Sequence, residues 1–414
     1  MIKIFKIAIV IFFFILFSCK KKNNTHPKEI FNFDNSPVTA GSMQPFLFAK
    51  NDQVFMSWTQ KKSDSLYGLN FASFSEGKWS EVKEIRSGSN WFVNWADFPS
   101  ITKSGSNMLA HYLQKSDNAT YAYDIRLNLS NDRGENWHKD FLLHNDGTKT
   151  EHGFVTMIPY ENDTFIVTWL DGRNTGSGKG HEENDEHQGN GAMNLRAANV
   201  LSTGEVISDA LLDDKTCDCC QTTAVITQKG PIVFYRDRSN EEIRDIYFSR
   251  MVDGSWSIPQ AVFNDHWVIN GCPVNGPKAD SKDNTVVVAW FTAAGNVPKV
   301  NIAFSVNNGK TFDLPIKIDL GNPIGRVDVA LINEDNALVS WIESTDENAN
   351  FMALKVNRSG KKNNTLLLSE ISASRASGFP QLELMNDTVL LAWNHIFEDQ
   401  IIIRTKSIPI SSFN

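Results

Sequence analysis

The most distinctive group of reactive side chains in this sequence consists of four cysteines: Cys217, Cys219, Cys220 and Cys272. The first three fall within four residues, and the fourth lies between a glycine and a proline. Thiolates in such a group can close disulfides or bind a soft cation such as Cu(I) or Zn²⁺. We expect disulfides, for which three pairings are open. The alternative is a metal site that also uses His144 or His152.

Arginines follow predicted strands or lie in the connections between them: Arg173, Arg236, Arg238, Arg326 and Arg375. Planar guanidinium groups match the geometry of carboxylate, sulfate and phosphate groups. We therefore predict that these five arginines bind an anionic ligand. The alternative is that each of Arg173 and Arg238 pairs with a nearby aspartate, Asp171 or Asp237, and braces neighbouring parts of the fold.

Carboxylates that could transfer protons occur near the same strand ends: Asp97, Asp171, Asp237 and Glu343. Hydrolysis of a glycosidic bond generally needs two such groups, and we predict Asp97 and Asp237 for this role. Trp95 lies two residues before Asp97 and could form a wall on which a sugar stacks. The loop at 174–191 is rich in glycine, acids and histidine. A solvated insertion is one interpretation of this loop, and a Ca²⁺ site is the other.

The elements that must position these side chains follow one repeat. An apolar, β-branched segment ending in Trp or Tyr recurs at 54–58, 108–112, 165–169, 232–235, 286–290, 337–341 and 389–393. A repeat of about fifty residues with strand-like content indicates a β-propeller, in which each unit is a four-stranded blade. We predict an all-β fold with seven blades, and six is the alternative. In a propeller, the loops after the second strands and those between blades share one face, so the residues above would meet there.

Two turns carry a recognisable motif. Residues 130–137 read Ser-Asn-Asp-Arg-Gly-Glu-Asn-Trp, and residues 305–312 are a weaker copy that ends in Phe312. This pattern resembles the Asp-box, or BNR repeat, of sialidases and related propellers. It predicts a turn between third and fourth strands. There the Asp or Asn side chain bonds nearby backbone, Gly takes a positive φ, and the aromatic residue packs between sheets.

The resemblance to sialidase-like propellers implies a glycan ligand. Sialidases bind a sugar carboxylate with three arginines, use a tyrosine assisted by a glutamate as nucleophile, and use an aspartate as acid/base. Asp97 matches that aspartate in position only. The first-blade arginine motif of the family is absent, and no tyrosine follows Tyr247, although the family nucleophile lies in later blades.

The chain begins with a targeting segment at 1–18, where two lysines precede an apolar run too short to span a membrane. Cys19 follows directly and resembles the acylated cysteine of bacterial lipoproteins, so we predict a lipid anchor in the bacterial cell envelope. Residues 19–37 would be a tether and 38–414 a single propeller domain. Loss of Lys3 and Lys6 with the targeting segment changes the net charge from −8 to −10. This charge argues against nucleic acid as a partner.

These observations favour an envelope-anchored protein that recognises and could hydrolyse an anionic or complex glycan. Two alternatives remain open at this point. One is a propeller that binds ligands or partners without catalysis, and the other is a metal-handling protein built on the cysteine group.

Overall fold

The computed structural model describes residues 36–176, 191–397 and 400–414. The targeting segment, Cys19, most of the tether and most of the 174–191 loop lie outside these ranges. Within them no helix is long and apolar enough to cross a membrane. The predictions of a lipid anchor and of a Ca²⁺ site in the loop therefore stay predictions.

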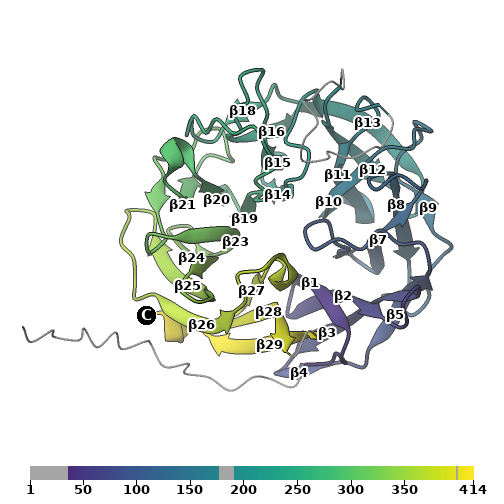
Figure 1. Cartoon of the computed structure of the whole chain (residues 1–414), viewed down its shortest axis with the longest axis horizontal. Helices are drawn as coiled ribbons and strands as arrows, with labels where there is room; N and C mark the ends of the chain where they lie inside the picture. The colour runs from purple at the N-terminus through teal and green to yellow at the C-terminus, as the bar shows by residue number, and fades with distance from the viewer. Residues whose placement is uncertain (1–35, 177–190, 398–399) are drawn as a thin grey trace, which may run out of the picture.

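Seven antiparallel sheets follow one another around a central axis (Figure 1). The first three are β1 (Ser42–Lys50) to β5 (Lys83–Gly88), β6 (Ile101–Ser104) to β9 (Phe141–Leu142), and β10 (His152–Tyr160) to β13 (Val206–Asp213). The fourth and fifth are β14 (Thr223–Thr227) to β18 (Gln260–Ala261) and β19 (Lys278–Lys282) to β22 (Ile316–Lys317). The last two are β23 (Pro323–Asn333) to β26 (Leu366–Ile371) and β27 (Gln381–Met385) to β29 (Gln400–Pro409). The chain is thus a seven-bladed β-propeller, as the repeat predicts, and not a six-bladed one.

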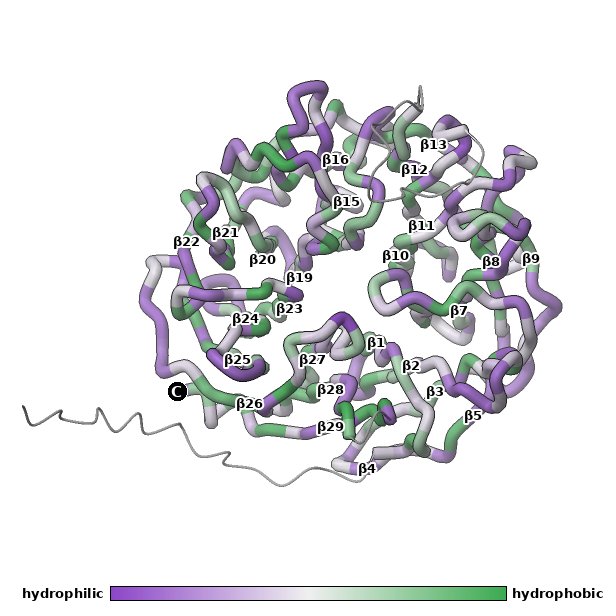
Figure 2. The backbone as a smooth tube through the Cα atoms, in the orientation of Figure 1, coloured by the Kyte–Doolittle hydropathy of each residue, from purple (hydrophilic) through white to green (hydrophobic). Residues whose placement is uncertain are grey.

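The repeated segment is the second strand of every blade. These strands are β2 (Gln53–Lys61), β7 (Asn107–Lys115), β11 (Thr164–Asp171), β15 (Gly230–Arg236), β20 (Thr285–Thr292), β24 (Asn336–Ser344) and β28 (Thr388–Phe397). Their terminal aromatic residues are buried, and five of them are tryptophans that rank among the largest fully buried side chains. Hydrophobic stretches of the chain coincide largely with the strands, and hydrophilic ones with the turns (Figure 2). Burial of a β-branched strand on both faces explains why these segments read as continuous apolar runs.

The predicted turns form the expected hydrogen bonds. After β8 (Tyr123–Ser130), the Ser130 hydroxyl accepts from Gly134 N at 2.9 Å, and Asp132 Oδ1 accepts from Asn136 N at 2.9 Å. Gly134 has φ +83°. The Trp137 ring meets Phe71 of the first blade edge-on, at 6.0 Å between centroids. The copy at 305–312 repeats these bonds after β21 (Lys299–Ser305), and its Phe312 packs against the fourth blade. The turn therefore fixes its own backbone and wedges an aromatic ring between blades.

Side chains of one blade bond the inner strand of the next. Asp280 accepts from Leu331 N at 2.7 Å, and Asp328 accepts from Leu382 N at 2.9 Å. At the seam between the last and first blades, Asn394 Oδ1 accepts from Gln44 N at 3.2 Å. Buried backbone N–H groups need a partner, and these contacts supply it where the inner strands face the central channel.

The seventh blade has three strands, β27 to β29. An outer strand from the segment near 31–38 would complete this blade, and most of that segment lies outside the described residues. Residues 36–38 are not in a strand. Val38 packs on the hydrophobic cluster shared by the first and seventh blades, which closes the ring through side chains.

Candidate functional site

Three of the predicted ligand-binding arginines are engaged by the protein itself. Arg236 is buried and donates to the carbonyls of Arg244, Asn275 and Phe291 at 2.6–3.0 Å. Arg173 forms a bidentate pair with Asp171, as the alternative interpretation foresaw. Arg238 bonds Asp218 and Glu242 rather than Asp237. These guanidinium groups brace the loops of the third and fourth blades.

The other two predicted arginines lie together over one aromatic side chain. Arg326 and Arg375 have their guanidinium carbons 4.8 Å and 5.9 Å from the Trp95 ring. Arg326 is buried and donates to the carbonyls of Ser374 and Gly378, whereas Arg375 is exposed. Phe379 stacks on Trp95 at 5.6 Å between centroids. Burial, with Arg375 nearby, lowers the pKa of Arg326 to about 10.

A cavity of about 510 Å³ opens beside this aromatic and cationic group. Trp95, Asp97 and Arg375 line it, which brings together three of the predicted residues. Within the described part of the chain, no ion pair holds Arg375, so its guanidinium is available to a ligand. Asp237 does not line the cavity. It follows β15 and bonds through its backbone to Asp245.

A tyrosine hydroxyl in the cavity wall joins two carboxyl groups. Tyr123 Oη lies 2.9 Å from Asp97 Oδ2 and 2.8 Å from Glu151 Oε1. Tyr123 begins β8 of the second blade, and Glu151 directly precedes β10 of the third. The Phe92 ring stacks on Tyr123 at 3.9 Å between centroids and fixes its orientation. Asp97 Oδ1 accepts from Phe154 N at 2.8 Å, so the same carboxyl also ties the second blade to the third.

Burial is the main cause of the shifted pKa values of Asp97, Glu151 and Tyr123. Burial raises the pKa of Asp97 to about 7, against the hydrogen bonds from Phe154 and Tyr123. Burial also raises the pKa of Glu151 to about 8, and the charges of Asp97 and Asp218 add to the effect. The pKa of Tyr123 lies well above its usual value for the same reason. At neutral pH the pair therefore retains a proton that the Tyr123 hydroxyl can pass from one carboxyl group to the other.

The exposed fractions of these three side chains indicate which of them a ligand would contact first. Asp97 and Tyr123 are 2% and 0% exposed, whereas Glu151 is half-buried at the cavity surface. Tyr123, Glu151 and Arg244, which also lines the cavity, were missed from the sequence. The sequence carries no local signal for Tyr123 or Glu151; Glu151 directly precedes the titratable His152, which is itself the first residue of the inner strand β10.

The other candidate carboxylates are held by tryptophans of their own strands. Trp169 Nε1 donates to Asp171 at 2.8 Å, and Trp341 Nε1 donates to Glu343 at 2.6 Å. Glu343 also accepts from the backbone N of Leu320 and Asn322. These bonds give both carboxylates a structural role at the ends of β11 and β24.

The histidines near the cysteines form a separate group. His144 and His152 stack with centroids 3.7 Å apart, and Asp146 Oδ2 lies 3.0 Å and 3.1 Å from their ring nitrogens. Arg173 Nη2 is 3.4 Å from the same carboxylate. Lone pairs in two parallel rings do not converge on one point, so this group suits a hydrogen-bonded brace behind Glu151 better than a metal ion.

The cysteines form one disulfide instead of two. Cys219 bonds Cys272 and joins the connection before the fourth blade to the connection before the fifth. This bond belongs to one of the three pairings that the sequence leaves open. Cys217 and Cys220 are free thiols and fully buried. Because Cys219 is bonded, only two thiols of the group remain for a soft metal.

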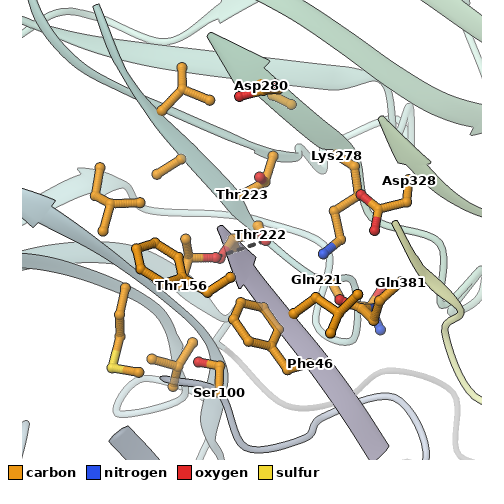
Figure 3. Close-up of a pocket in the computed structure, with 18 of the residues that line it drawn as sticks. Phe46, Ser100, Thr156, Gln221, Thr222, Thr223, Lys278, Asp280, Asp328 and Gln381 are labelled. Atoms are coloured by element: carbon orange, nitrogen blue, oxygen red, sulfur yellow. Dashed lines mark hydrogen bonds between the residues drawn. The ribbon is translucent and has the colours of Figure 1, made fainter. Parts of the chain in front are cut away.

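A second cavity, of about 350 Å³, lies along the inner strands at the propeller axis. Lys278 points between Asp328 and Gln381, with Gln221 and Phe46 nearby (Figure 3). Asp97 and Phe154 line both cavities. Asp280 and Asp328 in this channel bond backbone N–H groups of the next blade, so we assign these two acids to structure.

No protein-family model and no curated protein matches this chain. Solved structures do match this chain. A polysaccharide lyase of family 25, an ulvan lyase bound to a glucuronate–sulfated rhamnose saccharide, superposes with a TM-score of 0.53 at 12% identity, covering 92% of this chain and 94% of that one. A Hadza microbial sialidase gives a TM-score of 0.49 at 14% identity, covering 87% and 76%. An α-L-arabinofuranosidase of Fusarium graminearum gives 0.47 at 10%, covering 92% and 97%.

The class that these data define is an all-β, seven-bladed propeller, with a fold similar to that of the polysaccharide lyase. At such low identity the likeness establishes the fold alone. The function must come from the residues of the site.

Proposed function

We propose that this protein recognises an acidic glycan in the 510 Å³ cavity and cleaves a glycosidic bond there. The observation that carries the proposal is the Tyr123 hydroxyl placed between Asp97 and Glu151 in a wall that Trp95 and Arg375 share. Trp95 presents a partly exposed aromatic ring in this wall, and the exposed guanidinium of Arg375 matches a carboxylate or sulfate. The predicted lipid anchor at Cys19 would hold this site at the cell envelope.

The three hydrogen-bonded groups suit general acid–base catalysis. Glu151 faces the cavity and holds a proton at neutral pH, so it would protonate the departing oxygen of the bond that breaks. A water molecule would then add to the anomeric carbon, and its proton would return to Glu151 through Asp97 and the Tyr123 hydroxyl. Tyrosine, glutamate and aspartate are also the residue types of the sialidase mechanism. Here, however, they come from the first three blades, and the covered Tyr123 ring favours a proton relay over a nucleophile.

The test compares acidic and neutral oligosaccharides on the purified chain. Calorimetry would measure binding, and an assay of new reducing or unsaturated ends would measure cleavage. We expect acidic glycans alone to bind, Arg375→Gln to weaken binding at least about tenfold, and Glu151→Gln to abolish cleavage while binding persists.

Arg358→Gln is the matched control, because Arg358 is a partly exposed arginine paired with Asp335 on another part of the surface. It should leave binding unchanged. Equal binding of neutral and acidic glycans, or full activity of the Glu151→Gln chain, would overturn the proposal.

A further inference from the structure

The two free cysteines lie next to the Cys219–Cys272 disulfide. Cys217 and Cys220 are three residues apart, their Sγ atoms are 2.8 Å apart, and they are 0% and 1% exposed. Cys219 lies between them in sequence, and the sulfurs of all three fall within 4.8 Å of one another. A buried dithiol is therefore in reach of a bonded sulfur. Cys272, at the other end of the disulfide, is exposed at the cavity.

The surroundings favour a thiolate on one member of the pair. Arg244 Nη1 lies 3.5 Å from Cys217 Sγ, and Arg244 is itself buried. Burial opposes ionisation of Cys217, but the hydrogen bond from Cys220 and the charges of Arg244 and Arg236 outweigh it and lower the pKa of Cys217 to about 7. Burial and the neighbouring Cys217 raise the pKa of Cys220 well above its usual value. Thiol–disulfide exchange starts from a nucleophilic thiolate, and here Cys217 is that thiolate while Cys220 keeps its proton.

The same surroundings disfavour a metal cation. Cys219 is already bonded to Cys272, so only Cys217 and Cys220 remain to bind one. Two buried guanidinium groups also place positive charge beside the sulfurs. The chemistry that these four cysteines support best is therefore exchange of a sulfur–sulfur bond.

We propose that Cys217 and Cys220 form an intramolecular thiol–disulfide exchange site with the Cys219–Cys272 bond. The Cys217 thiolate attacks Cys219 Sγ, so a Cys217–Cys219 bond forms and Cys272 leaves as a thiolate. Cys220 then attacks Cys217 Sγ and releases Cys219. One sulfur–sulfur bond breaks and one forms, and the two protons of the buried thiols end on Cys219 and Cys272. The two forms are redox isomers, so the step needs no external oxidant or reductant.

The exchange would change the wall of the cavity. In the first form the staple joins the loops before the fourth and fifth blades. In the second form those loops are no longer bonded, and Cys272 presents an exposed thiol at the cavity. Such a thiol could exchange with a small disulfide compound, so that one half of that compound becomes bound to Cys272 and the other half leaves as a thiol. This site is independent of the proposed glycan chemistry, because no cysteine takes part in that reaction.

The test traps the leaving thiol without added reductant. The full chain with Cys19→Ser, brought to two thiols per molecule, is incubated natively with N-ethylmaleimide, then digested and mapped by mass spectrometry. Because Cys217 and Cys220 are buried, we expect the adduct on Cys272 to accumulate together with a Cys217–Cys220 disulfide. Cys217→Ser should lower the Cys272 adduct at least about tenfold. Cys220→Ser should stop the reaction at a Cys217–Cys219 disulfide with Cys272 still labelled.

Two results would overturn the proposal. One is labelling confined to Cys217 and Cys220 while the Cys219–Cys272 disulfide persists in every variant. The other is stoichiometric Zn or Cu bound to the fully reduced chain, with the four thiols protected by the metal. If Cys217→Ser fails to fold, the intermediate expected in Cys220→Ser still decides between exchange and no exchange.

Discussion

Replacement of Arg236 tests whether this arginine stabilises the fold, in contrast to Arg375, which we propose binds the ligand. Arg236→Gln removes a buried guanidinium whose nitrogens donate four hydrogen bonds to three backbone carbonyls, and whose carbon lies 4.9 Å from the Trp267 ring. A charge-assisted bond of this kind contributes about 1.5–3 kcal/mol. The shorter amide could satisfy at most part of the set. We therefore expect a loss of about 3–5 kcal/mol in the free energy of unfolding, because buried carbonyls would be left without a donor.

Urea unfolding followed by tryptophan fluorescence would measure this loss. Arg375→Gln is the matched variant, because the Arg375 side chain is exposed at the cavity. It should change stability by no more than about 0.5 kcal/mol while it weakens binding of an acidic glycan. A loss below about 1 kcal/mol for Arg236→Gln would refute the structural assignment, because it would mean that water or neighbouring groups replace the bonds at little cost.

Two further predictions concern pH and a turn. The raised pKa values of Asp97 and Glu151 mean that the folded chain binds more protons than the unfolded one between about pH 4 and 8. Stability should therefore fall as pH rises from about 4 to 8 and level off above 8, and Glu151→Gln should flatten this slope in thermal melts. Gly134→Ala should cost about 1–3 kcal/mol, because φ is +83° and a Cβ would lie 2.5 Å from Phe71 Cζ. Gly254→Ala, with φ +79° and open space around it, isolates the backbone cost, so equal losses for both variants would contradict the steric argument.

The parts of the fold that local patterns encode were predictable from the sequence. Each second strand carries its own apolar run and terminal aromatic residue, so seven blades could be counted without knowledge of their contacts. The turn at 130–137 bonds mainly to itself, and its geometry follows from its own residues. Fourth strands were harder. The stretch 255–262, whose sequence reads as one strand, is split into β17 (Ser255–Trp256) and β18, with Pro259, which has no N–H to donate, in the break.

The site was predictable only in part, because its members meet through tertiary contacts. Asp97, Trp95 and Arg375 lie in loops that the propeller geometry assigns to one face. Tyr123 and Glu151 have no such local signal, and the approach of a hydroxyl at the start of β8 to a carboxyl group before β10 depends on how two blades pack. The fate of Arg236 depends likewise on carbonyls 39 and 55 residues later in the chain.

The seam between the first and last blades constrains how this chain can fold. Ile403 N donates to the Ser42 hydroxyl, and Gln44 N donates to Asn394, across 361 and 350 positions of sequence. Contacts so distant carry a large loop-closure entropy and form slowly. During synthesis the first blade therefore cannot form its contacts with the seventh blade until the last strand has left the ribosome. Until then, one side of the first blade's sheet stays exposed. Closure of the ring is then the step at which a nascent chain is most open to aggregation or to chaperone binding.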